Sequence, residues 1–327
     1  MIRAGLQIPN FTYPDTSPDQ LFEKIAAVAV AAEESGWDTV MVMDHFYQLP
    51  LLGPPENEML ESYTLLAALA ARTSTVNLGT LVTGVTYRNP AILAKIVTTL
   101  DVVSRGRAFL GIGAAWFDVE HEGLGVDFPP VKERFERLTE ALEICRAMFR
   151  DERPTIEGRH YRVKGAINSP PPVRPGGPPI MIGGQGEKKT LRLMAEYADM
   201  ANLISGFDEL PRKLDVLAGH CEAVGRDMAT INKTPLLSLF LGATMEDAVA
   251  KVDTRLAGMG MKWADLDEGF RAQLGSRFII GDPDTVGERI AALIGLGLDG
   301  VCLNMVADGH DPENVAFAGE VVTKALP

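Results

Sequence analysis

The stretch RAFLGIGAAWFDVEHEGLG, residues 107–125, separates two interpretations of this chain as an α/β protein. Its apolar run ends in GIGAAW (111–116), which begins like the dinucleotide-binding pattern G-x-G-x-x-G but has Trp116 in place of the third glycine. That glycine lets a helix pack closely on its strand. A polar, glycine-interrupted segment also separates Trp116 from the next helical pattern. We therefore interpret residues 107–113 as a barrel strand whose small terminal residues leave room for a ligand.

The rest of the chain alternates short apolar segments with amphipathic helical segments. Eight segments are predicted to be strands, at residues 3–8, 38–44, 76–84, 107–113, 179–184, 199–205, 234–242 and 297–305. Eight strands, each followed by a helix, are typical of a parallel (β/α)8 barrel, also called a TIM barrel. An open doubly wound sheet is the alternative α/β fold.

We predict a single α/β domain over residues 1–327, with insertions after the second, fourth and seventh strands. A chain of this length suits one barrel, since α/β barrels are larger than most domains. Residues 151–179 are expected to form a short hairpin and a proline-rich return segment. Residues 257–282 are expected to be an insertion before the last helix–strand unit of the barrel.

The composition excludes several classes of function. The net charge is −13 and no cluster of Lys and Arg is present, which argues against nucleic acid as a ligand because its phosphates need clustered cations. No run of about 18 apolar residues could cross a membrane. Three widely separated cysteines and the lack of a signal-peptide pattern indicate a cytoplasmic protein. No metal-binding spacing is found, so we expect no resident metal ion.

Two predicted strand ends carry residues that are suited to chemistry. After the second strand, Asp44 precedes His45, an imidazole that can move a proton near neutral pH when a neighbour fixes its tautomer. A structural Asp–His pair that braces the next loop is the alternative. After the third strand, Thr83 could offer a hydroxyl group and Arg88 a cation for an anionic ligand. Strand formation and surface charge explain these two residues equally well.

The sequence IGGQGEKKT (182–190), after the fifth predicted strand, is a glycine-rich turn that enters a helix. Backbone amides at such a helix start, together with the helix dipole, favour an anion. Phosphate is the natural ligand, and its candidate contacts are Gly183, Gly184, Gln185, Gly186 and Lys188. A tight turn with exposed lysines is the alternative. Because no nucleophile elbow is present, we expect a bound cofactor to supply the chemistry.

Taken together, these segments resemble the bacterial-luciferase-like superfamily, in its branch that uses the deazaflavin coenzyme F420. The chain looks most like actinobacterial F420-dependent oxidoreductases of unassigned substrate, and the resemblance covers nearly all of it. The resemblance rests on the order and spacing of VMDHF (42–46), LGTLVTGVTYRNPAILAK (78–95), GRAFLGIGAAWFDVEHEGLGVDFPPVKERFERLTEAL (106–142), PPIMIGGQGEKKTLRLMAEYAD (178–199) and IGDPDTVGERI (280–290).

The resemblance implies a TIM barrel with the deazaflavin ring at the carboxyl ends of the strands. It places a bulge behind the ring, often with a non-prolyl cis peptide, at Leu81-Val82, next to Thr83. Asp44 and His45 would lie beside the ring, with His45 as general acid or base. The other cofactor contacts would be Gly113, Ala114 and Ala115 along the ring and ribityl chain, and Gly183, Gly184, Gln185 and Gly186 at the phosphate.

One position departs from the sugar-phosphate dehydrogenases of this branch, which have a glutamate where this chain has Trp116. Without that carboxylate, a sugar phosphate is not the expected substrate. An aromatic wall at Trp116, with Phe11 and Phe46 as further candidates for the substrate pocket, favours an apolar or planar substrate. Glu120 and His121 would restore a polar group only if their loop folds back.

We therefore expect an oxidoreductase that transfers a hydride between F420 and a small organic substrate, with His45 handling the proton. An FMN-dependent two-component monooxygenase of the same superfamily is the first alternative, since both cofactors carry a phosphate. F420 also has an oligoglutamate tail, for which Arg88 and Lys188 are candidate partners. A non-catalytic deazaflavin- or flavin-binding protein is the second alternative. The resemblance also implies a homodimer.

Overall fold

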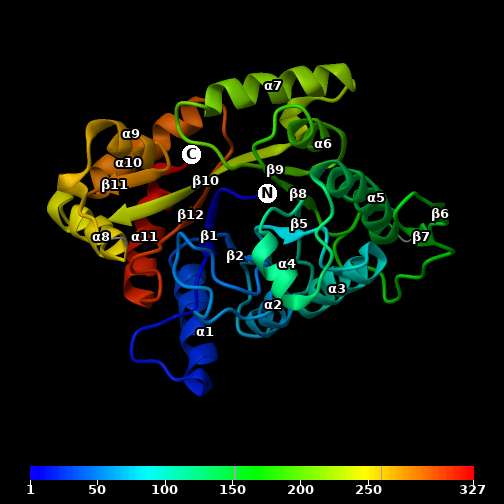
Figure 1. Cartoon of the computed structure of the whole chain (residues 1–327), viewed down its shortest axis with the longest axis horizontal. Helices are drawn as coiled ribbons and strands as arrows, with labels where there is room; N and C mark the ends of the chain where they lie inside the picture. Colours follow the sequence, from blue (N-terminus) through cyan, green and yellow to red (C-terminus); the bar gives the residue numbers. More distant parts are fainter. Residues whose placement is uncertain (151, 259) are drawn as a thin grey trace.

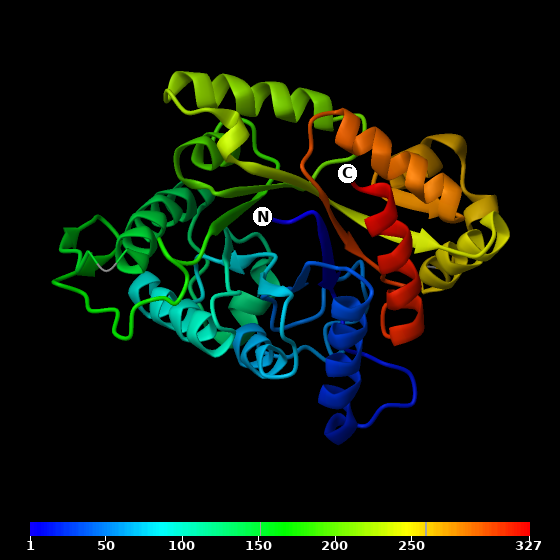
Figure 2. The ribbon, with the colours of Figure 1, turned by 180° about the vertical axis from the view of Figure 1, so that it is seen from behind.

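Parallel strands form a nearly closed barrel in the computed structural model, which describes residues 1–150, 152–258 and 260–327. Figures 1 and 2 show these strands at the centre of the molecule, with helices around them. The strands are β1 (Ala4–Ile8), β2 (Thr39–Val42), β3 (Asn77–Thr80), β4 (Thr83–Gly84), β5 (Leu110–Gly113), β8 (Ile180–Gly184), β9 (Met200–Leu203), β10 (Asn232–Leu241) and β12 (Val301–Asn304). Their order in the sheet is β3-β2-β1-β12-β10-β9-β8-β5-β4.

The two ends of this sheet meet between β3 and β5. The amide of Leu78 donates a hydrogen bond to the carbonyl of Arg107 at 2.9 Å, and the amide of Phe109 donates to the carbonyl of Leu78 at 3.1 Å. Beyond this bridge the chain leaves β3 and returns as β4, which pairs with Ile112 and Gly113 of β5. The barrel therefore closes, and the predicted TIM-barrel fold is confirmed.

Amphipathic helices cover the outside of the barrel (Figure 1). They are α1 (Pro18–Glu34), α2 (Ser62–Ala70), α3 (Pro90–Val103), α5 (Val131–Phe149), α6 (Thr190–Tyr197), α7 (Leu210–Ala223), α8 (Met245–Ala257), α10 (Pro283–Gly295) and α11 (Pro312–Ala325). Their starts follow from the sequence, since Pro18 begins α1 and the Asp282 side chain accepts from the Thr285 amide at α10. No helix among the described residues is both long and apolar enough to span a bilayer.

Three elements differ from the sequence-based expectation. The helix α4 (Asp118–Leu124) occupies the segment that was interpreted as a polar, glycine-interrupted stretch after β5. The helix α9 (Glu268–Gly275) and the strand β11 (Phe278–Gly281) lie in the segment expected to be an insertion. β11 is parallel to the second half of β10 and pairs with it outside the closed barrel.

The segment before β8 extends away from the barrel. In it, β6 (Ile156–Glu157) and β7 (Arg162–Val163) form an antiparallel pair, seen at the edge of the molecule in Figure 2. Short 3-10 helices lie at Met228–Thr230 and Trp263–Asp265. Residues 151 and 259, which fall within the two predicted insertions, lie outside the described residues.

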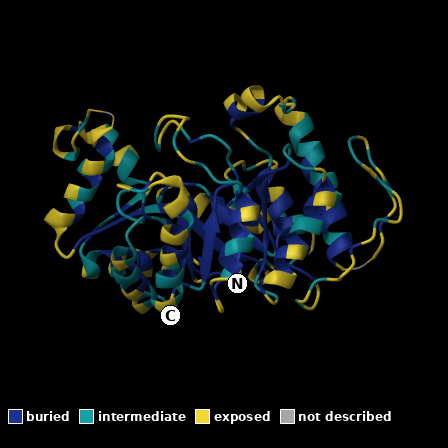
Figure 3. Cartoon of the chain, turned by 90° about the horizontal axis from the view of Figure 1, so that it is seen from below, coloured by how far each residue is buried: buried dark blue, intermediate teal, exposed yellow. Residues whose placement is uncertain are grey.

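The interior of the barrel is apolar along most of its axis and becomes polar toward its carboxyl end. Apolar side chains fill most of it, from Ile2, Met41, Leu81, Phe109, Met181, Met200 and Cys302. Polar residues lie in the carboxyl halves of three strands, at Gln7 of β1, Asn202 of β9 and Asn304 of β12. Figure 3 shows that buried residues are concentrated on the strands and on the inner faces of the helices. The polar side chains therefore lie at the carboxyl end of the barrel, next to an apolar core.

Candidate active site

The chain after β3 forms a bulge at the carboxyl end of the barrel. The peptide bond between Leu81 and Val82 is cis, as the family resemblance implies. The carbonyl oxygen of Leu81 accepts a hydrogen bond from Gln7 Nε2 at 3.1 Å. Thr83 is fully buried, and its hydroxyl group lies 2.6 Å from that of Tyr63. The Thr83 hydroxyl is therefore engaged inside the protein, rather than offered to a ligand.

The side chain of Val82 lies over two strands that have glycine at the facing positions. A Cβ atom on Gly183 would lie 2.9 Å from Val82 Cγ1, and one on Gly113 would lie 3.0 Å from Val82 Cγ2. Both distances are shorter than normal carbon–carbon contacts, so Val82 would have to shift to admit a larger residue on β5 or β8. Ala114 and Ala115 continue from Gly113 and are half-buried. These residues form a surface of backbone and small side chains against which a flat ring can pack.

The turn from β8 into α6 also depends on glycine. Gly184 has a φ angle of 147°, which favours glycine, and a Cβ atom on Gly186 would lie 2.9 Å from Thr190 Oγ1. Gln185, Gly186 and Lys188 are exposed, so the turn is accessible to a ligand. An anion at this place would meet the amino-terminal end of α6.

Charged neighbours make this turn electropositive. Its acidic residue, Glu187, is compensated by α7, because Lys213 Nζ donates to Glu187 Oε1 at 2.8 Å and Arg212 Nη2 donates to Oε2 at 2.9 Å. Lys188 and Lys189 are exposed and add two positive charges. The turn can therefore attract a phosphate group, although the protein carries a net charge of −13.

His45 follows β2, after Met43 and Asp44, and contacts Glu120, which α4 brings back over the barrel. His45 Nδ1 and Glu120 Oε1 are 2.7 Å apart. The amides of Phe46 and Tyr47 donate to Glu120 Oε2 at 2.7 and 3.3 Å, and Tyr87 donates its hydroxyl hydrogen to Oε1. Glu120 is fully buried. The segment after β5 therefore does fold back, and it restores a carboxylate beside His45.

The protonation states of Glu120 and Tyr87 follow from these contacts. Burial raises the pKa of Glu120, but hydrogen bonds from His45, Tyr87 and the Phe46 amide outweigh burial and hold this pKa below its ordinary value. Burial and the hydrogen bond to Glu120 both raise the pKa of Tyr87. Near neutral pH, Glu120 is therefore an anion that accepts, and Tyr87 is a neutral phenol that donates.

His121, the next residue along α4, has a different environment. Its Nδ1 lies 2.7 Å from the carbonyl oxygen of Phe117, and its Nε2 lies 2.7 Å from Thr86 Oγ1. Because a carbonyl oxygen can only accept, Nδ1 carries a hydrogen. The ring of His121 also stacks on that of Tyr87, with centroids 4.6 Å apart. His121 therefore supports Tyr87, and both of its nitrogens are engaged within the protein.

Asp44 does not form the expected pair with His45. Arg88 Nη1 and Nη2 donate to the two carboxylate oxygens of Asp44 at 2.6 and 3.0 Å, and the Ser62 hydroxyl donates to Oδ1 at 2.6 Å. Arg88 Nη2 also donates to Glu61 Oε1 at 2.6 Å. The expectation that Arg88 faces an anionic ligand does not fit this geometry, because two carboxylates already compensate its charge.

The three aromatic candidates lie in different environments. Trp116 is 61% exposed, and its ring meets that of His45 edge-on, with centroids 5.8 Å apart. Phe46 is half-buried and packs edge-on against Tyr87. Phe11 is 1% exposed and belongs to the main hydrophobic core. Trp116 and Phe46 thus border the site, whereas the expectation that Phe11 lines a substrate pocket is not met, because packing encloses it.

Buried polar atoms near this end of the barrel have no partner among the described residues. Gln7 donates from Nε2 to the Leu81 carbonyl, so Gln7 Oε1 is the acceptor that faces Asn304 Nδ2 at 3.0 Å. This fixes the orientation of Asn304 and leaves its Oδ1 unpaired, as are Asn202 Oδ1 and Ser205 Oγ. An unpaired buried acceptor destabilises a protein, so a water molecule or a ligand with N–H or O–H donors would be stabilising beside these atoms.

Sequence reasoning named Glu120 only conditionally and missed Tyr87, Asn202 and Asn304 as site residues. The two asparagines had a detectable signal, since each is a polar amide within an otherwise apolar strand. Tyr87 and Glu120 had none, because their contacts join residues 33 and 75 positions apart in the chain.

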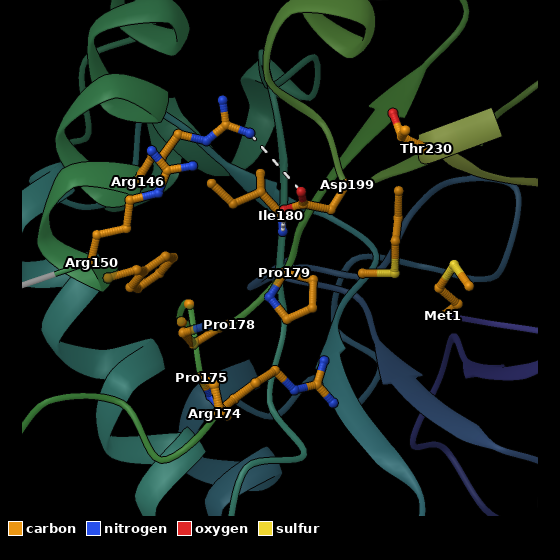
Figure 4. Close-up of a pocket in the computed structure, with 14 residues that line it drawn as sticks. Met1, Arg146, Arg150, Arg174, Pro175, Pro178, Pro179, Ile180, Asp199 and Thr230 are labelled. Carbon is orange, nitrogen blue, oxygen red and sulfur yellow. Dashed lines mark hydrogen bonds and ion pairs between the residues drawn. The ribbon is translucent and has the colours of Figure 1, made fainter. Parts of the chain in front are cut away.

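A separate cavity of about 360 Å³ opens at the opposite face, beside the residues that precede β8 and β9. Figure 4 shows Arg146, Arg150 and Arg174 around it, with Arg146 lying 4.0 Å from Asp199. In TIM barrels, the amino-terminal face serves stability and the carboxyl-terminal face serves catalysis. The residues lining this cavity do not include the group around His45. The candidate active site is therefore at the other end of the barrel.

Comparison with known proteins agrees with this architecture. The model of the luciferase-like monooxygenase family matches residues 2–300. The chain belongs to this family. Among luciferase-like relatives, an F420-dependent glucose-6-phosphate dehydrogenase of Segniliparus rotundus is 31% identical over 314 residues, which cover 88% of this chain and 89% of the relative.

Two solved structures show the same luciferase-like fold. An F420-dependent secondary alcohol dehydrogenase, in complex with an F420–acetone adduct, has a TM-score of 0.80 at 20% identity, over 100% of this chain and 99% of the other. The oxygenating constituent of 3,6-diketocamphane monooxygenase from Pseudomonas putida, in complex with FMN, has a TM-score of 0.73 at 21% identity, over 100% and 99%. At such identities the likeness concerns the fold alone.

Proposed function

We propose that this luciferase-like protein is an oxidoreductase that moves a hydride between coenzyme F420 and a small organic substrate. The observation that carries the choice of cofactor is the similarity, over 88% of the chain, to a relative named as an F420-dependent dehydrogenase. The geometry supports a cofactor with a flat ring and a phosphate group. A glycine-lined surface beneath Val82 and an electropositive turn before α6 lie at the same end of the barrel.

The residues at this end fit such a cofactor. The ring would pack beside Val82, whose side chain lies against Gly113 and Gly183 and would be displaced by any larger residue at either position. The turn that ends with Lys188 would hold the phosphate. The unpaired Oδ1 of Asn304 would accept a hydrogen bond from the cofactor or the substrate. When bound, F420 supplies the hydride chemistry, while the protein binds, orients and excludes water.

His45 is the residue proposed to hold or release the proton that accompanies hydride transfer. Its side chain is 14% exposed and lies edge-on to the rings of Trp116 and Phe117, which limits the access of water. His45→Ala should lower kcat/KM by about 100-fold or more, which is what a positioned acid–base group contributes. The Kd for F420 should change little. Unchanged turnover in this variant would remove His45 from the mechanism.

The cofactor is tested by titrating the protein separately with F420 and with FMN, and following tryptophan fluorescence. We expect tighter binding of F420, with quenching that Trp116→Phe diminishes because Trp116 borders the site. Lys188→Ala should weaken F420 more than FMN, since only F420 carries an oligoglutamate tail. Lys24→Ala, on the exposed side of α1, is the matched control. Equal affinity of the two cofactors for wild-type protein would contradict the proposal.

An FMN-dependent monooxygenase is the second candidate, because the fold is compatible with FMN as well as with F420. It predicts tighter binding of FMN and substrate oxidation that needs O₂ and a partner reductase. A non-catalytic binding protein would instead bind F420 with no substrate-dependent change in its absorbance. The same titration, followed by a substrate screen with oxidised and reduced F420, separates these alternatives.

We propose an apolar or planar substrate, because exposed Trp116 borders His45. Glu120 supplies a carboxylate beside His45, so the loss of a glutamate at position 116 does not by itself exclude a sugar phosphate. Glucose 6-phosphate, named for the relative from Segniliparus rotundus, therefore belongs in the screen. Turnover of glucose 6-phosphate above all apolar alcohols and ketones would contradict the proposed substrate class.

We further propose that the protein works in the cytoplasm as a homodimer. Cys145, Cys221 and Cys302 are buried free thiols, as expected in a reducing compartment. Sedimentation equilibrium should give twice the chain mass of 35.3 kDa. A mass equal to that of one chain at micromolar concentration would overturn the dimer.

A further inference from the structure

The Glu120 carboxylate is surrounded entirely by donors. Its Oε2 accepts from two backbone amides, those of Phe46 and Tyr47. Its Oε1 accepts from the Tyr87 hydroxyl and lies 2.7 Å from His45 Nδ1. With no exposed surface, Glu120 cannot exchange any of these partners for bulk water. A carboxylate in this setting has no hydrogen to give, so each neighbour must supply one.

The contact between His45 and Glu120 therefore decides which ring nitrogen carries the hydrogen. Nδ1 must donate, because the facing oxygen can only accept. We infer that Glu120 is a positioning residue that holds the hydrogen of neutral His45 on Nδ1 and leaves Nε2 as the atom that takes up or releases a proton. The catalytic consequence rests on the proposed function, whereas the position of the hydrogen is a property of the protein itself.

The surroundings of His45 fix the plane of its ring as well. The ring meets those of Trp116 and Phe117 at interplanar angles of 75° and 73°. These two residues come from the same segment as Glu120, so the end of β5 and α4 set both the tilt and the tautomer. A ring held in this way presents Nε2 in one direction only, which is what proton transfer to an oriented partner requires.

The other titratable and charged groups of this region are occupied elsewhere. Tyr87 donates to Glu120 and stacks on His121. His121 is bound to Phe117 and Thr86. Asp44, the residue before His45, is bound by Arg88, which also binds Glu61. Among the described residues, Glu120 is therefore the group in direct contact with a His45 nitrogen.

Glu120→Gln is a sharp test because it makes one end of the side chain a donor. The amides of Phe46 and Tyr47 can be satisfied only by the glutamine oxygen, which turns the NH₂ group toward His45 and Tyr87. A donor that faces Nδ1 requires Nδ1 to accept, so the hydrogen should move to Nε2. Glu122→Gln, an exposed position on the same helix, is the matched control.

The experiment is a long-range ¹H–¹⁵N spectrum of protein labelled with ¹⁵N-histidine, in which the two neutral tautomers give different cross-peak patterns. His45→Gln identifies the signals of His45 among the five histidines. We expect the Nδ1–H form in the wild type and in Glu122→Gln, and the Nε2–H form in Glu120→Gln. An Nε2–H wild type, or a Glu120→Gln spectrum identical to that of the wild type, would overturn the inference. The wild-type spectrum decides the first point even if Glu120→Gln does not fold.

Turnover gives a second readout. In Glu120→Gln, kcat/KM should fall about 100-fold with KM nearly unchanged, because Nε2 then carries the hydrogen and can no longer take up a proton. A fall in kcat/KM without the change of tautomer in the spectrum would indicate a merely structural role. If F420 is not the cofactor, the titration fails while the tautomer result stands; if the inference is wrong, the titration is unaffected.

Discussion

At the scale of single residues, the main difference between sequence and structure is the task of the charged side chains. Arg88 suggested a cation for a ligand, yet its guanidinium joins Asp44, in the segment after β2, to Glu61 at the start of α2. The pair is largely buried, with side-chain exposures of 12% for Arg88 and 1% for Asp44. Sequence shows a charge but not its partner, because the partner is 44 residues away.

Replacing Arg88 with methionine tests the contribution of the Arg88–Asp44 ion pair to stability. The variant keeps the length of the side chain but leaves the buried Asp44 carboxylate without its cation, so the free energy of unfolding should fall by about 3–5 kcal/mol. Urea unfolding measures the loss, and the double variant Arg88→Met/Asp44→Asn should recover part of it. Arg72→Met, which breaks an exposed pair with Glu23, should cost much less, because water screens this pair. Equal losses of unfolding free energy in Arg88→Met and Arg72→Met would contradict a stabilising role of the Arg88–Asp44 pair.

At the scale of elements, the eight barrel strands could be predicted because each is a short apolar run followed by a helical pattern. The cis peptide at Leu81–Val82 followed from the resemblance. The helix α4 could not be predicted, since it has only seven residues, contains Gly123 and is followed directly by Gly125. It carries Glu120, so missing this helix also meant missing the partner of His45.

The packing of the bulge on β8 gives a prediction about an element. Gly183→Ala would place a Cβ atom 2.9 Å from Val82 Cγ1, so it should lower the free energy of unfolding by about 1–3 kcal/mol and weaken cofactor binding. Adding Val82→Ala should relieve the clash and restore stability. Gly219→Ala, inside α7 with no atom within 4 Å of the new Cβ, should instead be neutral or stabilising by up to about 1 kcal/mol. Thermal unfolding and fluorescence titration measure both effects.

At the scale of the whole molecule, stability should fall on the acid side of neutrality. Glu33, on α1, accepts from the amides of Ser74, Thr75 and Val76 before β3. Burial raises the pKa of Glu33, but these hydrogen bonds outweigh it, so the net pKa lies below the ordinary 4.5. A lowered pKa in the folded state adds stability above the ordinary value, and this stability is lost as the pH falls through the folded value.

We therefore expect the free energy of unfolding in urea to decrease between about pH 5 and about pH 3. In Glu33→Gln, part of this decrease should be absent, because the side chain no longer titrates. Glu34→Gln, exposed on the same helix, is the control and should follow the wild type. If Glu33→Gln and wild type lose stability in parallel, the hydrogen bonds to the segment before β3 do not contribute as described.

The pairing of the ten-residue strand β10 with three other strands should limit local unfolding of this part of the sheet. Its first half pairs with β9, and its second half pairs with β12 on one side and β11 on the other. An amide in the second half of β10 becomes exposed to solvent only when β10 separates from β11 or β12, the strands that pair with it. In deuterium oxide, the amides of residues 236–241 should therefore exchange far more slowly than those around α4, where one short helix holds Glu120 in place. Glu120 would then lie on the part of the protein that opens first, and the tautomer of His45 would no longer be fixed long before the barrel unfolds.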